Sequence, residues 1–392
     1  MMTPSFPAVK PKESESGAAP AGVLSVNVGS SSLKFAFYPV RQGEVFPATE
    51  VGTLEGLEAG EAAFEAALKS LFQRLGAEHT LEHVLAVAHR VVHGGGVYAG
   101  SVLASDEVLQ DLARFNPLAP LHQPHNLAGV ARFRAALPEV PQVICFDTAF
   151  HQEIAPTETH FALPDHLLAQ GIRRYGFHGL SYQHVCHMLW SRSQAAQGRL
   201  LMAHLGNGAS LCAARAGQSC ATTMGFTALD GLMMGTRSGA LDPGVVLYLL
   251  AHGWNAEQIE HLLYRQSGLL GVSGLSSDMR VLRASDDARA RFAIEAFTAR
   301  VIRESGALIA VLRGLDALVF TGGIGEHDIQ LREDVAQGLA WLGVELDQQA
   351  NQAARGQAIM AIHGAQSKVE VWVVPADEGR ATAREAVQLL GL

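Results

Sequence analysis

The chain has 392 residues, of which 48% are hydrophobic and 17% charged, and its formal net charge is -9 at pH 7. This length favours two or three domains over a single core. The acidic balance, without a run of Lys or Arg, excludes nucleic acid as an expected partner, and no stretch approaches the roughly eighteen consecutive apolar residues of a membrane span, so no membrane association is expected.

The start of the chain and its cysteines both bear on where the protein works. Residues 1–22 contain Pro, Ser, Glu, Lys and Ala without an apolar segment, so we expect a disordered leader and no secretory signal. The four cysteines show no C-x-x-C spacing, and three of them lie in apolar stretches. These cysteines are typical of reduced core residues, which favours a cytoplasmic protein.

Three apolar runs, each a predicted buried strand, end in a turn of glycine and hydroxyl residues. They are 23–27 followed by 29–32, 201–205 followed by 206–210, and 317–321 followed by 322–325. Glycine lets backbone N–H groups approach phosphate closely, and Ser or Thr hydroxyls add donors. None of the turns fits G-x-x-x-x-G-K-[ST], and none is a G-x-G-x-x-G turn that opens a helix. The sequence therefore predicts a polyphosphate site of another architecture.

The first two turns lie within similar hairpin patterns. Residues 23–38 read VLSVNV, GSSS and LKFAFY, and residues 201–214 read LMAHL, GNGAS and LCAA. This repetition predicts two domains of related topology. Between the hairpins, apolar residues at helical spacing predict a helix over 64–75, with Gly76 at the position of a C-terminal cap.

The other predicted elements alternate between strands and helices. Apolar runs at 84–92 and 143–146 predict short buried strands, and apolar spacing over 292–301 predicts a long helix before the strand at 317–320. The tail after Pro375 is rich in Ala, Arg and Glu and predicts a closing helix. Together these elements predict an α/β fold with helices packed on mixed sheets.

Nine sequence motifs follow one another along the chain. They are VNVGSSSLKF (26–35), HRVVHGG (89–95), PLAPLHQP (117–124), FDTAFH (146–151), RRYGFHG (173–179), HLGNGAS (204–210), MGFTALDGLMMGTRSG (224–239), SSDMR (276–280) and TGGIGEH (321–327). In this order they resemble the acetate kinase family, from residue 23 to the C-terminus. The resemblance implies a ribonuclease H-like fold of two duplicated α/β domains, shared with sugar kinases, actin and the Hsp70 ATPase. We expect an N-terminal domain over 23–149 to which a helix over 380–392 returns, and a C-terminal domain over 150–379 with most of the ATP site.

The resemblance also implies an activity, with alternatives. It implies reversible in-line transfer of phosphate from ATP to acetate, giving acetyl phosphate and ADP, by a cytoplasmic homodimer with Mg²⁺ or, as a second choice, Mn²⁺. A propionate or other short-chain carboxylate kinase is the nearest alternative. A nucleotide-gated, non-enzymatic module of the Hsp70 or actin type would need no carboxylate pocket. A sugar kinase would need an aspartate base and polar contacts in place of Val92, Leu121 and Phe177.

Charged residues supply the chemistry that such a transfer requires. The acceptor carboxylate and the phosphate are both anions, so positive charge is needed between them; Arg90 and Arg237 are the candidates. By resemblance, His178 stabilises the transition state, His122 is a weaker second candidate, and Asp147 is the catalytic aspartate. Because a carboxylate substrate is already ionised at pH 7, we expect Asp147 to orient Arg237 or the metal shell and not to act as a base.

The resemblance assigns further residues to the nucleotide and the metal. Asn27 and Glu378 are the expected ligands of Mg²⁺, which prefers oxygen ligands and keeps several waters. The expected phosphate contacts are Ser30, Ser32 and Lys34, followed by the turn His204, Leu205, Gly206, Asn207 and Gly208. The expected adenosine contacts are Asp278, Met279, Arg280, Gly323, Ile324, Gly325, Glu326 and His327.

Three departures from the family pattern concern the substrates. Ala228 stands where proline is usual, in the wall of the methyl pocket with Val92, Leu121 and Phe177. Alanine is the smaller residue, and each extra buried methylene contributes about 0.8 kcal/mol, so propionate is expected to be accepted as well as acetate. His327 replaces the usual asparagine, and the sequence Asp-Glu-Gly at 377–379 replaces Asn-Glu-Glu.

Overall fold

The computed structural model describes residues 20–29, 31–57, 61–77, 81–120 and 122–392. Residues 1–19 of the expected leader therefore lie outside the described residues, and its last residue, Gly22, begins the first strand. Within the described ranges, no helix is long and apolar enough to cross a membrane.

The first sheet has the strand order β3-β2-β1-β5-β7-β6, with β4 paired to β2. Its strands are β1 (Gly22–Val28), β2 (Ser32–Arg41), β3 (Glu44–Val45), β4 (Glu50–Glu55), β5 (Val84–Val91), β6 (Val102–Leu103) and β7 (Gln142–Phe146). β1 and β2 form the predicted antiparallel hairpin, whereas β1, β5 and β7 run parallel. The carboxyl ends of these parallel strands consequently meet at one edge of the sheet.

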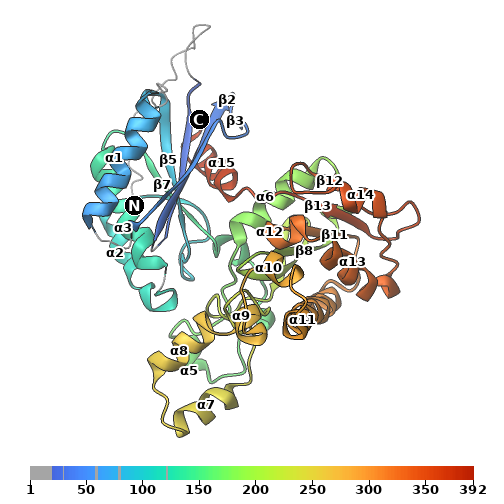
Figure 1. Cartoon of the computed structure of the whole chain (residues 1–392). Helices are drawn as coiled ribbons and strands as arrows, with labels where there is room; N and C mark the ends of the chain where they lie inside the picture. Colours follow the sequence, from blue (N-terminus) through green and yellow to red (C-terminus); the bar gives the residue numbers. More distant parts are fainter. Residues whose placement is uncertain (1–19, 30, 58–60, 78–80, 121) are drawn as a thin grey trace.

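Helices cover both faces of the first sheet (Figure 1). Leu24, Val26 and Val28 of β1 pack with the apolar faces of α1 (Glu61–Ala77) and α3 (Gln123–Ala136), beside which lies α2 (Asp106–Ala113). Val23 faces the opposite side and packs with α15 (Glu378–Leu390). This alternation is the period-2 pattern of a strand buried on both faces.

The second sheet has the order β10-β9-β8-β11-β13-β12. Its strands are β8 (Arg199–Leu205), β9 (Ala209–Arg215), β10 (Gln218–Thr222), β11 (Ala317–Thr321), β12 (Met360–Ala361) and β13 (Glu370–Val373). β8 and β9 form an antiparallel hairpin, and β8, β11 and β13 run parallel. Both sheets thus combine a hairpin with two further parallel strands, which confirms the predicted α/β fold with a repeated mixed sheet.

The second sheet also lies between helices. Leu201, Ala203 and Leu205 of β8 pack with α11 (Ala288–Leu312), and Leu200 and Met202 pack on the other face with α6 (Gly179–Trp190). The predicted helix over 292–301 is only part of α11. The helix begins four residues earlier, at Ala288, because the Asp287 side chain caps it there, and it continues to Leu312.

The remaining elements are short or lie outside the two sheets. The helices are α4 (Pro156–Thr159), α5 (Asp165–Leu168), α7 (Pro243–Ala251), α8 (Ala256–Arg265), α9 (Gly268–Ser273), α10 (Met279–Arg283), α12 (Gly322–His327), α13 (Ile329–Gly338) and α14 (Gln348–Ala353). The 3-10 helices are η2 (Leu81–His83), η3 (Asn116–Leu118), η4 (Ala149–His151), η5 (Ala195–Gln197) and η6 (Ala340–Leu342).

The C-terminal helix α15 joins the end of the chain to its beginning (Figure 1). It packs against β1 and β5 of the first sheet and against α6. The hydroxyls of Ser25 in β1 and Thr382 in α15 are hydrogen-bonded at 2.8 Å in the interior. Glu378, the first residue of α15, is thereby held near the carboxyl ends of β1 and β5. The domain boundaries at 23–149 and 150–379 stay a prediction.

Candidate active site

A cavity of about 220 Å³ lies where the parallel strands of the first sheet end. The residues that line it come from the β1–β2 turn, the ends of β5 and β7, helix α3 and the segments around 177 and 228–237. They are Asn27, Val28, Gly29, Ser32, Lys34, Arg90, Val92, His122, Asn126, Asp147, Phe177, His178, Ala228 and Arg237. Eleven of these fourteen are residues that the sequence assigned to the site; the exceptions are Val28, Gly29 and Asn126.

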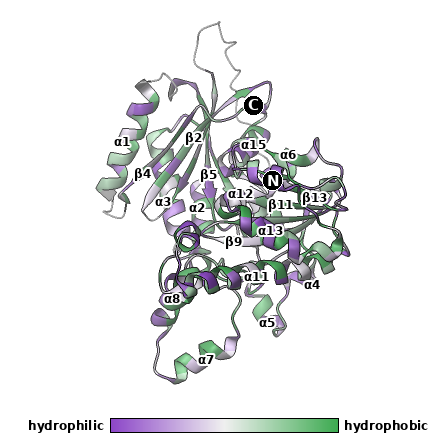
Figure 2. Cartoon of the chain, turned by 45° about the vertical axis from the view of Figure 1, so that its right-hand side comes forward, coloured by the Kyte–Doolittle hydropathy of each residue, from purple (hydrophilic) through white to green (hydrophobic). Residues whose placement is uncertain are grey.

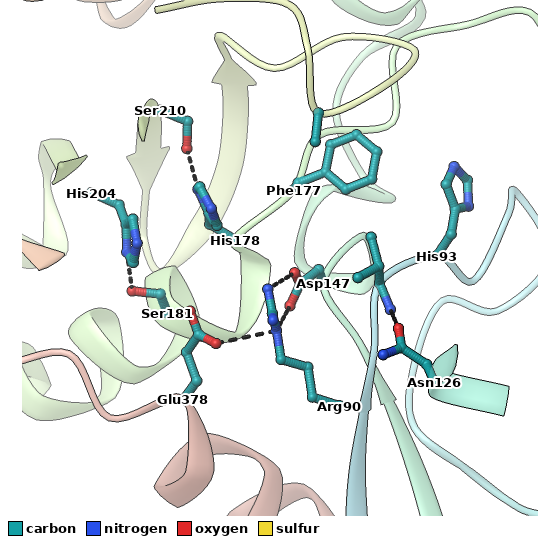
Figure 3. Close-up of polar contacts among 12 residues, drawn as sticks. Arg90, His93, Asn126, Asp147, Phe177, His178, Ser181, His204, Ser210 and Glu378 are labelled. Carbon is teal, nitrogen blue, oxygen red and sulfur yellow. Dashed lines mark hydrogen bonds and ion pairs between the residues drawn. The ribbon is translucent and has the colours of Figure 1, made fainter. Parts of the chain in front are cut away.

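Arg90 is held in the cavity wall by two carboxylates (Figure 3). Its Nε and Nη2 donate to the two carboxylate oxygens of Asp147, at 3.1 and 2.6 Å, and its Nε lies 3.1 Å from Oε2 of Glu378. The parallel register of β5 and β7 places Arg90 and Asp147 side by side, since Val91 pairs with Phe146, the residue before Asp147. In the structure the carboxylate of Asp147 is engaged by Arg90, and the expected role of Asp147 in orienting Arg237 or the metal shell stays a prediction.

The charges of this cluster shift one another's pKa. Burial raises the pKa of the Asp147 carboxyl, against the lowering effect of Arg90. Burial also acts to raise the pKa of Glu378, but Arg90, His204 and Lys34 outweigh it and hold that pKa below its usual value. Burial disfavours the Arg90 cation, yet the two carboxylates outweigh it and raise its pKa. Glu378 thus remains an ionised oxygen donor beside the cavity.

His178 occupies the N-terminal cap position of α6 in a left-handed conformation, with φ 58°. This conformation is uncommon for a residue with a side chain, and hydrogen bonds on both sides hold it. Gly179 N–H donates to the carbonyl of Asp147 at 2.9 Å, and the His151 ring lies 3.0 Å from the carbonyl of Phe177. The His178 ring stacks on His204 with centroids 4.2 Å apart. Burial and the neighbouring cations lower its pKa well below the usual value, so the ring is neutral at pH 7.

Arg237 brings an uncompensated positive charge to the other side of the cavity. Its Nη1 donates to the carbonyl of Ala228 at 3.0 Å, and among the described residues no carboxylate lies within ion-pair distance of it. The turn that carries it is closely packed, since a Cβ at Gly235 would overlap the side-chain amide of Asn207. Burial lowers the pKa of Arg237, but a guanidinium stays protonated at neutral pH. An anion is the ligand that this environment favours.

Apolar side chains form the remaining wall of the cavity. Val92, Phe177 and Ala228 line it, and they also line a second cavity of about 20 Å³ that extends towards Ala119 and Tyr264. Ala228 thus borders both spaces, and the wider methyl pocket expected from the smaller residue stays a prediction. Leu121, the fourth predicted wall residue, lies outside the described residues, whereas its neighbour His122 lines both cavities.

The polar end of the cavity is lined by candidate phosphate residues and by Asn27, one of the two candidate metal ligands. Asn27 and Lys34 are paired across the β1–β2 hairpin and line the cavity together with Ser32; Ser30 lies outside the described residues. Oxygen donors from Asn27 and Glu378 suit Mg²⁺, which is held by few protein ligands and keeps several waters. No cluster of three or more His, Cys, Asp or Glu suited to a metal occurs in the described part of the chain.

The two glycine turns of the second sheet lie beside each other, at the ends of the parallel strands β8 and β11. Gly322 has so little free space that a Cβ on it would lie 2.8 Å from the carbonyl of Leu205, and a Cβ on Gly206 would lie 3.9 Å from the backbone nitrogen of Gly323. The turn at 206–208 is joined to the Arg237 loop by a hydrogen bond from Gly235 N–H to the carbonyl of Asn207. The turns at 206–208 and 322–323 and the segment that leads to Arg237 therefore contact one another.

The candidate adenosine residues 278–280 and 323–327 do not line the cavity itself. Asp278 caps α10, and Arg280 is exposed and paired with Asp278. The carbonyls of Gly325 and Glu326 accept hydrogen bonds from Arg332, which is completely buried. These hydrogen bonds to the buried Arg332 fix the backbone of segment 323–327. The His327 side chain is exposed.

The Asp-Glu-Gly sequence at 377–379 has a structural explanation in the first sheet. The hydroxyl of Tyr38 donates to Asp377 at 2.6 Å. A Cβ at Gly379 would lie 2.5 Å from the same hydroxyl, which explains why glycine occurs here. Both residues therefore accommodate Tyr38 and leave Glu378 between them facing Arg90.

Several residues that shape the site were not found from the sequence. Asn126 lines the cavity, accepts from Val92 N–H at 3.1 Å and donates to the carbonyl of Val28 at 2.6 Å. Its only sequence signal is a polar side chain that follows a proline motif at the start of a helix. His151 contacts the carbonyl of Phe177, and Ser210 contacts the ring of His178. Both lie inside the quoted sequence motifs, but the sequence assigned neither of them a function.

Comparisons with known proteins agree with this geometry. A family model described as the acetokinase family matches residues 22–384. The chain is 47% identical to an acetate kinase of Rhodopseudomonas palustris, over 94% of this chain and 98% of that protein, and 41% identical to a propionate kinase of Edwardsiella piscicida, over 94% and 96%. The solved structure of an acetate kinase from Porphyromonas gingivalis is 37% identical, with a TM-score of 0.84, and covers 94% of this chain and 100% of that one.

Proposed function

The chain belongs to the acetokinase family, and on that premise we propose how its cavity transfers phosphate from ATP to acetate. The protein is a phosphotransferase with a carboxyl group as acceptor, and ATP is its phosphoryl donor. The observation that carries the proposal is a pair of arginines beside an apolar wall. Two guanidiniums suit two anions, and the wall of Val92, Phe177 and Ala228 suits the methyl group of the acceptor.

In this mechanism the acceptor needs no base, because acetate is already ionised. Arg90, fixed by Asp147 and Glu378, orients the carboxylate of the acceptor. Arg237 and the neutral ring of His178 donate to the equatorial oxygens of the transferring group, where charge is spread in a loose transition state. Asp147 acts through Arg90: it holds the guanidinium in position while burial excludes water. Lys34 and Ser32 contact the phosphates of the nucleotide.

The test of this function is the range of acceptors. We expect kcat/KM to be highest for acetate, lower by at most tens-fold for propionate and much lower for butyrate and for formate, which lacks the methyl group. If the rate of ATP hydrolysis were the same with and without a carboxylate, the proposal would fail. The protein would then resemble a nucleotide-gated module of the Hsp70 or actin type.

Propionate is a second acceptor that a specific observation favours, namely the small cavity beside Ala228. Ala228→Pro should fill part of this space and lower the propionate-to-acetate ratio of kcat/KM by up to tens-fold, because one methylene is worth about 1–3 kcal/mol of discrimination in an apolar pocket. The Ala228 carbonyl, which accepts from Arg237, is retained in the variant. A folded Ala228→Pro enzyme with an unaltered ratio would show that position 228 does not set acyl length.

We propose that Asn27 and Glu378 provide the protein's oxygens to Mg²⁺, with Mn²⁺ as a substitute. When bound, the ion supplies positive charge to the phosphate oxygens. Asn27→Ala and Glu378→Ala should both raise the Mg²⁺ concentration needed for half-maximal rate. Glu385→Ala is the matched control, since Glu385 lies in the same helix and bonds to Ser101, outside the cavity lining. An unchanged Mg²⁺ requirement in both site variants would remove the pair from the metal site.

We propose that the enzyme is a homodimer that associates through α7. Figures 1 and 2 show this helix projecting from the molecule, with apolar residues over much of its surface. None of its residues is buried, and Leu247 and Tyr248 are 66% and 61% exposed. Such an apolar surface is unusual on a monomer. Light scattering should give about twice the chain mass of 41.7 kDa, and Leu247→Glu combined with Tyr248→Glu should give a monomer. A wild-type monomer would contradict the proposal.

We also propose that the enzyme works in the cytoplasm. All four cysteines are free, and Cys145 and Cys212 are fully buried. Free cysteines are typical of a reducing compartment, where ATP is also available. Fractionation of the native cells, with detection by antibody, should recover the protein with the cytoplasmic markers; recovery with secreted proteins would refute this.

A further inference from the structure

The position of the proton on the neutral His178 ring decides whether this side chain can donate to the transferring phosphoryl group. A neutral imidazole carries one proton, on either Nδ1 or Nε2, and only the protonated nitrogen can donate. His178 lines the cavity, and its Nε2 would lie 3.4 Å from a Cβ placed on Gly208 of the phosphate turn. The ring can therefore donate to a transferring phosphoryl group only if the proton is on Nε2.

The other ring nitrogen contacts a buried pair of hydroxyl groups. Nδ1 of His178 lies 2.9 Å from Oγ of Ser210 in β9, and this Oγ lies 2.5 Å from the hydroxyl of Tyr182. Ser210 and Tyr182 are both fully buried. Tyr182 lies one turn after His178 in α6, its N–H bonded to the His178 carbonyl, so the two side chains project from one helix face towards the same strand. Figure 3 shows Ser210 directed at the His178 ring.

The direction of these hydrogen bonds follows from the burial of the phenol. In the described residues, Ser210 Oγ is the hydrogen-bond partner of the Tyr182 hydroxyl. If Ser210 donated to Tyr182, the phenol proton would be left buried without an acceptor, which costs free energy. If Tyr182 donates to Ser210, the serine proton goes to Nδ1 of His178 and every polar group is satisfied. Burial raises the pKa of Tyr182 well above its usual value, so the phenol keeps the proton it donates.

From this geometry we propose that Tyr182 and Ser210 form a hydrogen-bond relay that fixes the tautomer of His178, with the proton on Nε2 directed at the cavity. The proposal rests on the proposed function of His178 as a donor to the phosphoryl group. Ser210 and Tyr182 are positioning residues in this account: they touch neither substrate, and they act through the imidazole. His151 and Ser219 form a comparable pair at 2.8 Å, but their imidazole faces the carbonyl of Phe177 and not the cavity.

The direct test is the protonation pattern of the His178 ring by ¹⁵N NMR of the full-length enzyme labelled in histidine. The His178 signals are identified by their loss in His178→Gln. At neutral pH, we expect Nε2 to carry the proton and Nδ1 to be the unprotonated, hydrogen-bonded nitrogen. A wild-type ring with its proton on Nδ1 would overturn the relay. This readout needs no substrate, so it stands or falls separately from the proposed activity.

Kinetics provides the second test. Ser210→Ala should lower kcat on the order of 10–100-fold, as for other groups that orient a reactive imidazole, with KM for acetate and ATP little changed. Tyr182→Phe should lower kcat less, because Ser210 can still donate to Nδ1. Thr298→Val is the matched control: it deletes a buried hydroxyl in α11 that donates to the carbonyl of Ile294, and its kcat should match wild type. Wild-type kcat in Ser210→Ala would overturn the relay, whereas a wild-type enzyme that made no acyl phosphate would overturn the proposed function instead.

Discussion

Arg237→Ala should lower kcat by a factor on the order of 10³–10⁵, with a much smaller change in the KM for ATP. Arg237 is the guanidinium that faces the cavity without a carboxylate partner among the described residues, so its charge is available to the ligands. An arginine that acts on charge developing in the transition state contributes chiefly to kcat. Steady-state kinetics with saturating acetate and varied ATP gives both constants.

Two variants show whether the loss is specific to this guanidinium. Arg237→Lys retains a charge but loses the planar fork and should recover only part of the rate. Arg199→Ala removes an arginine that pairs with Asp316 in the second sheet, away from the cavity lining, and should leave kcat unchanged. If Arg237→Ala kept a near wild-type kcat, Arg237 would not belong to the catalytic group.

Arg90→Ala should raise the KM for the carboxylate strongly, lower kcat and destabilise the fold. The guanidinium holds Asp147 and Glu378 together, and its removal leaves the buried Asp147 carboxylate without its ion-pair partner and beside the negative charge of the half-buried Glu378. Breaking a buried pair in this way costs about 3–5 kcal/mol. Denaturation by urea measures the stability, and kinetics with varied acetate measures the KM. A defect confined to the KM for ATP would contradict the placement of Arg90 at the acceptor.

The pH dependence of Arg90→Ala separates its structural effect from its catalytic one. Without the arginine, the folded-state pKa of Asp147 should rise further above its unfolded value, and the pKa of Glu378, which Arg90 holds below its usual value, should rise as well. The folded variant should therefore bind more protons than the folded wild type. Stability relative to wild type should then improve as the pH falls towards the unfolded pKa of about 4. Adding Asp147→Asn should also restore stability, but not activity. Equal destabilisation at pH 5 and pH 8 would argue against buried unpaired carboxylates.

The repeated hairpins made the fold predictable, because local patterns determine them. The runs at 23–38 and 201–214 alternate around glycine turns, and both form the hairpins that the pattern predicts. The parallel strands that follow could also be placed, and most candidate residues of the first sheet line one cavity. These features depend on side-chain periodicity and turn chemistry, which a single sequence shows directly.

Pairing between distant residues could not be predicted from the same patterns. Asp147 binds Arg90 because strand register, which no motif reveals, places the two residues side by side. Tyr182 meets Ser210 only because α6 packs on β8 and β9. The glycine at 379 is explained by Tyr38, some 340 residues earlier, since a larger residue would overlap its hydroxyl.

The measurement that tests the account most directly is trapping of the product with hydroxylamine, which reacts with acyl phosphates and not with sugar phosphates. The purified chain with ATP, Mg²⁺ and acetate should form ADP and acetohydroxamate in equal amounts, and omission of acetate should abolish both. ADP formed without hydroxamate, at a rate independent of acetate, would contradict phosphoryl transfer to the carboxylate.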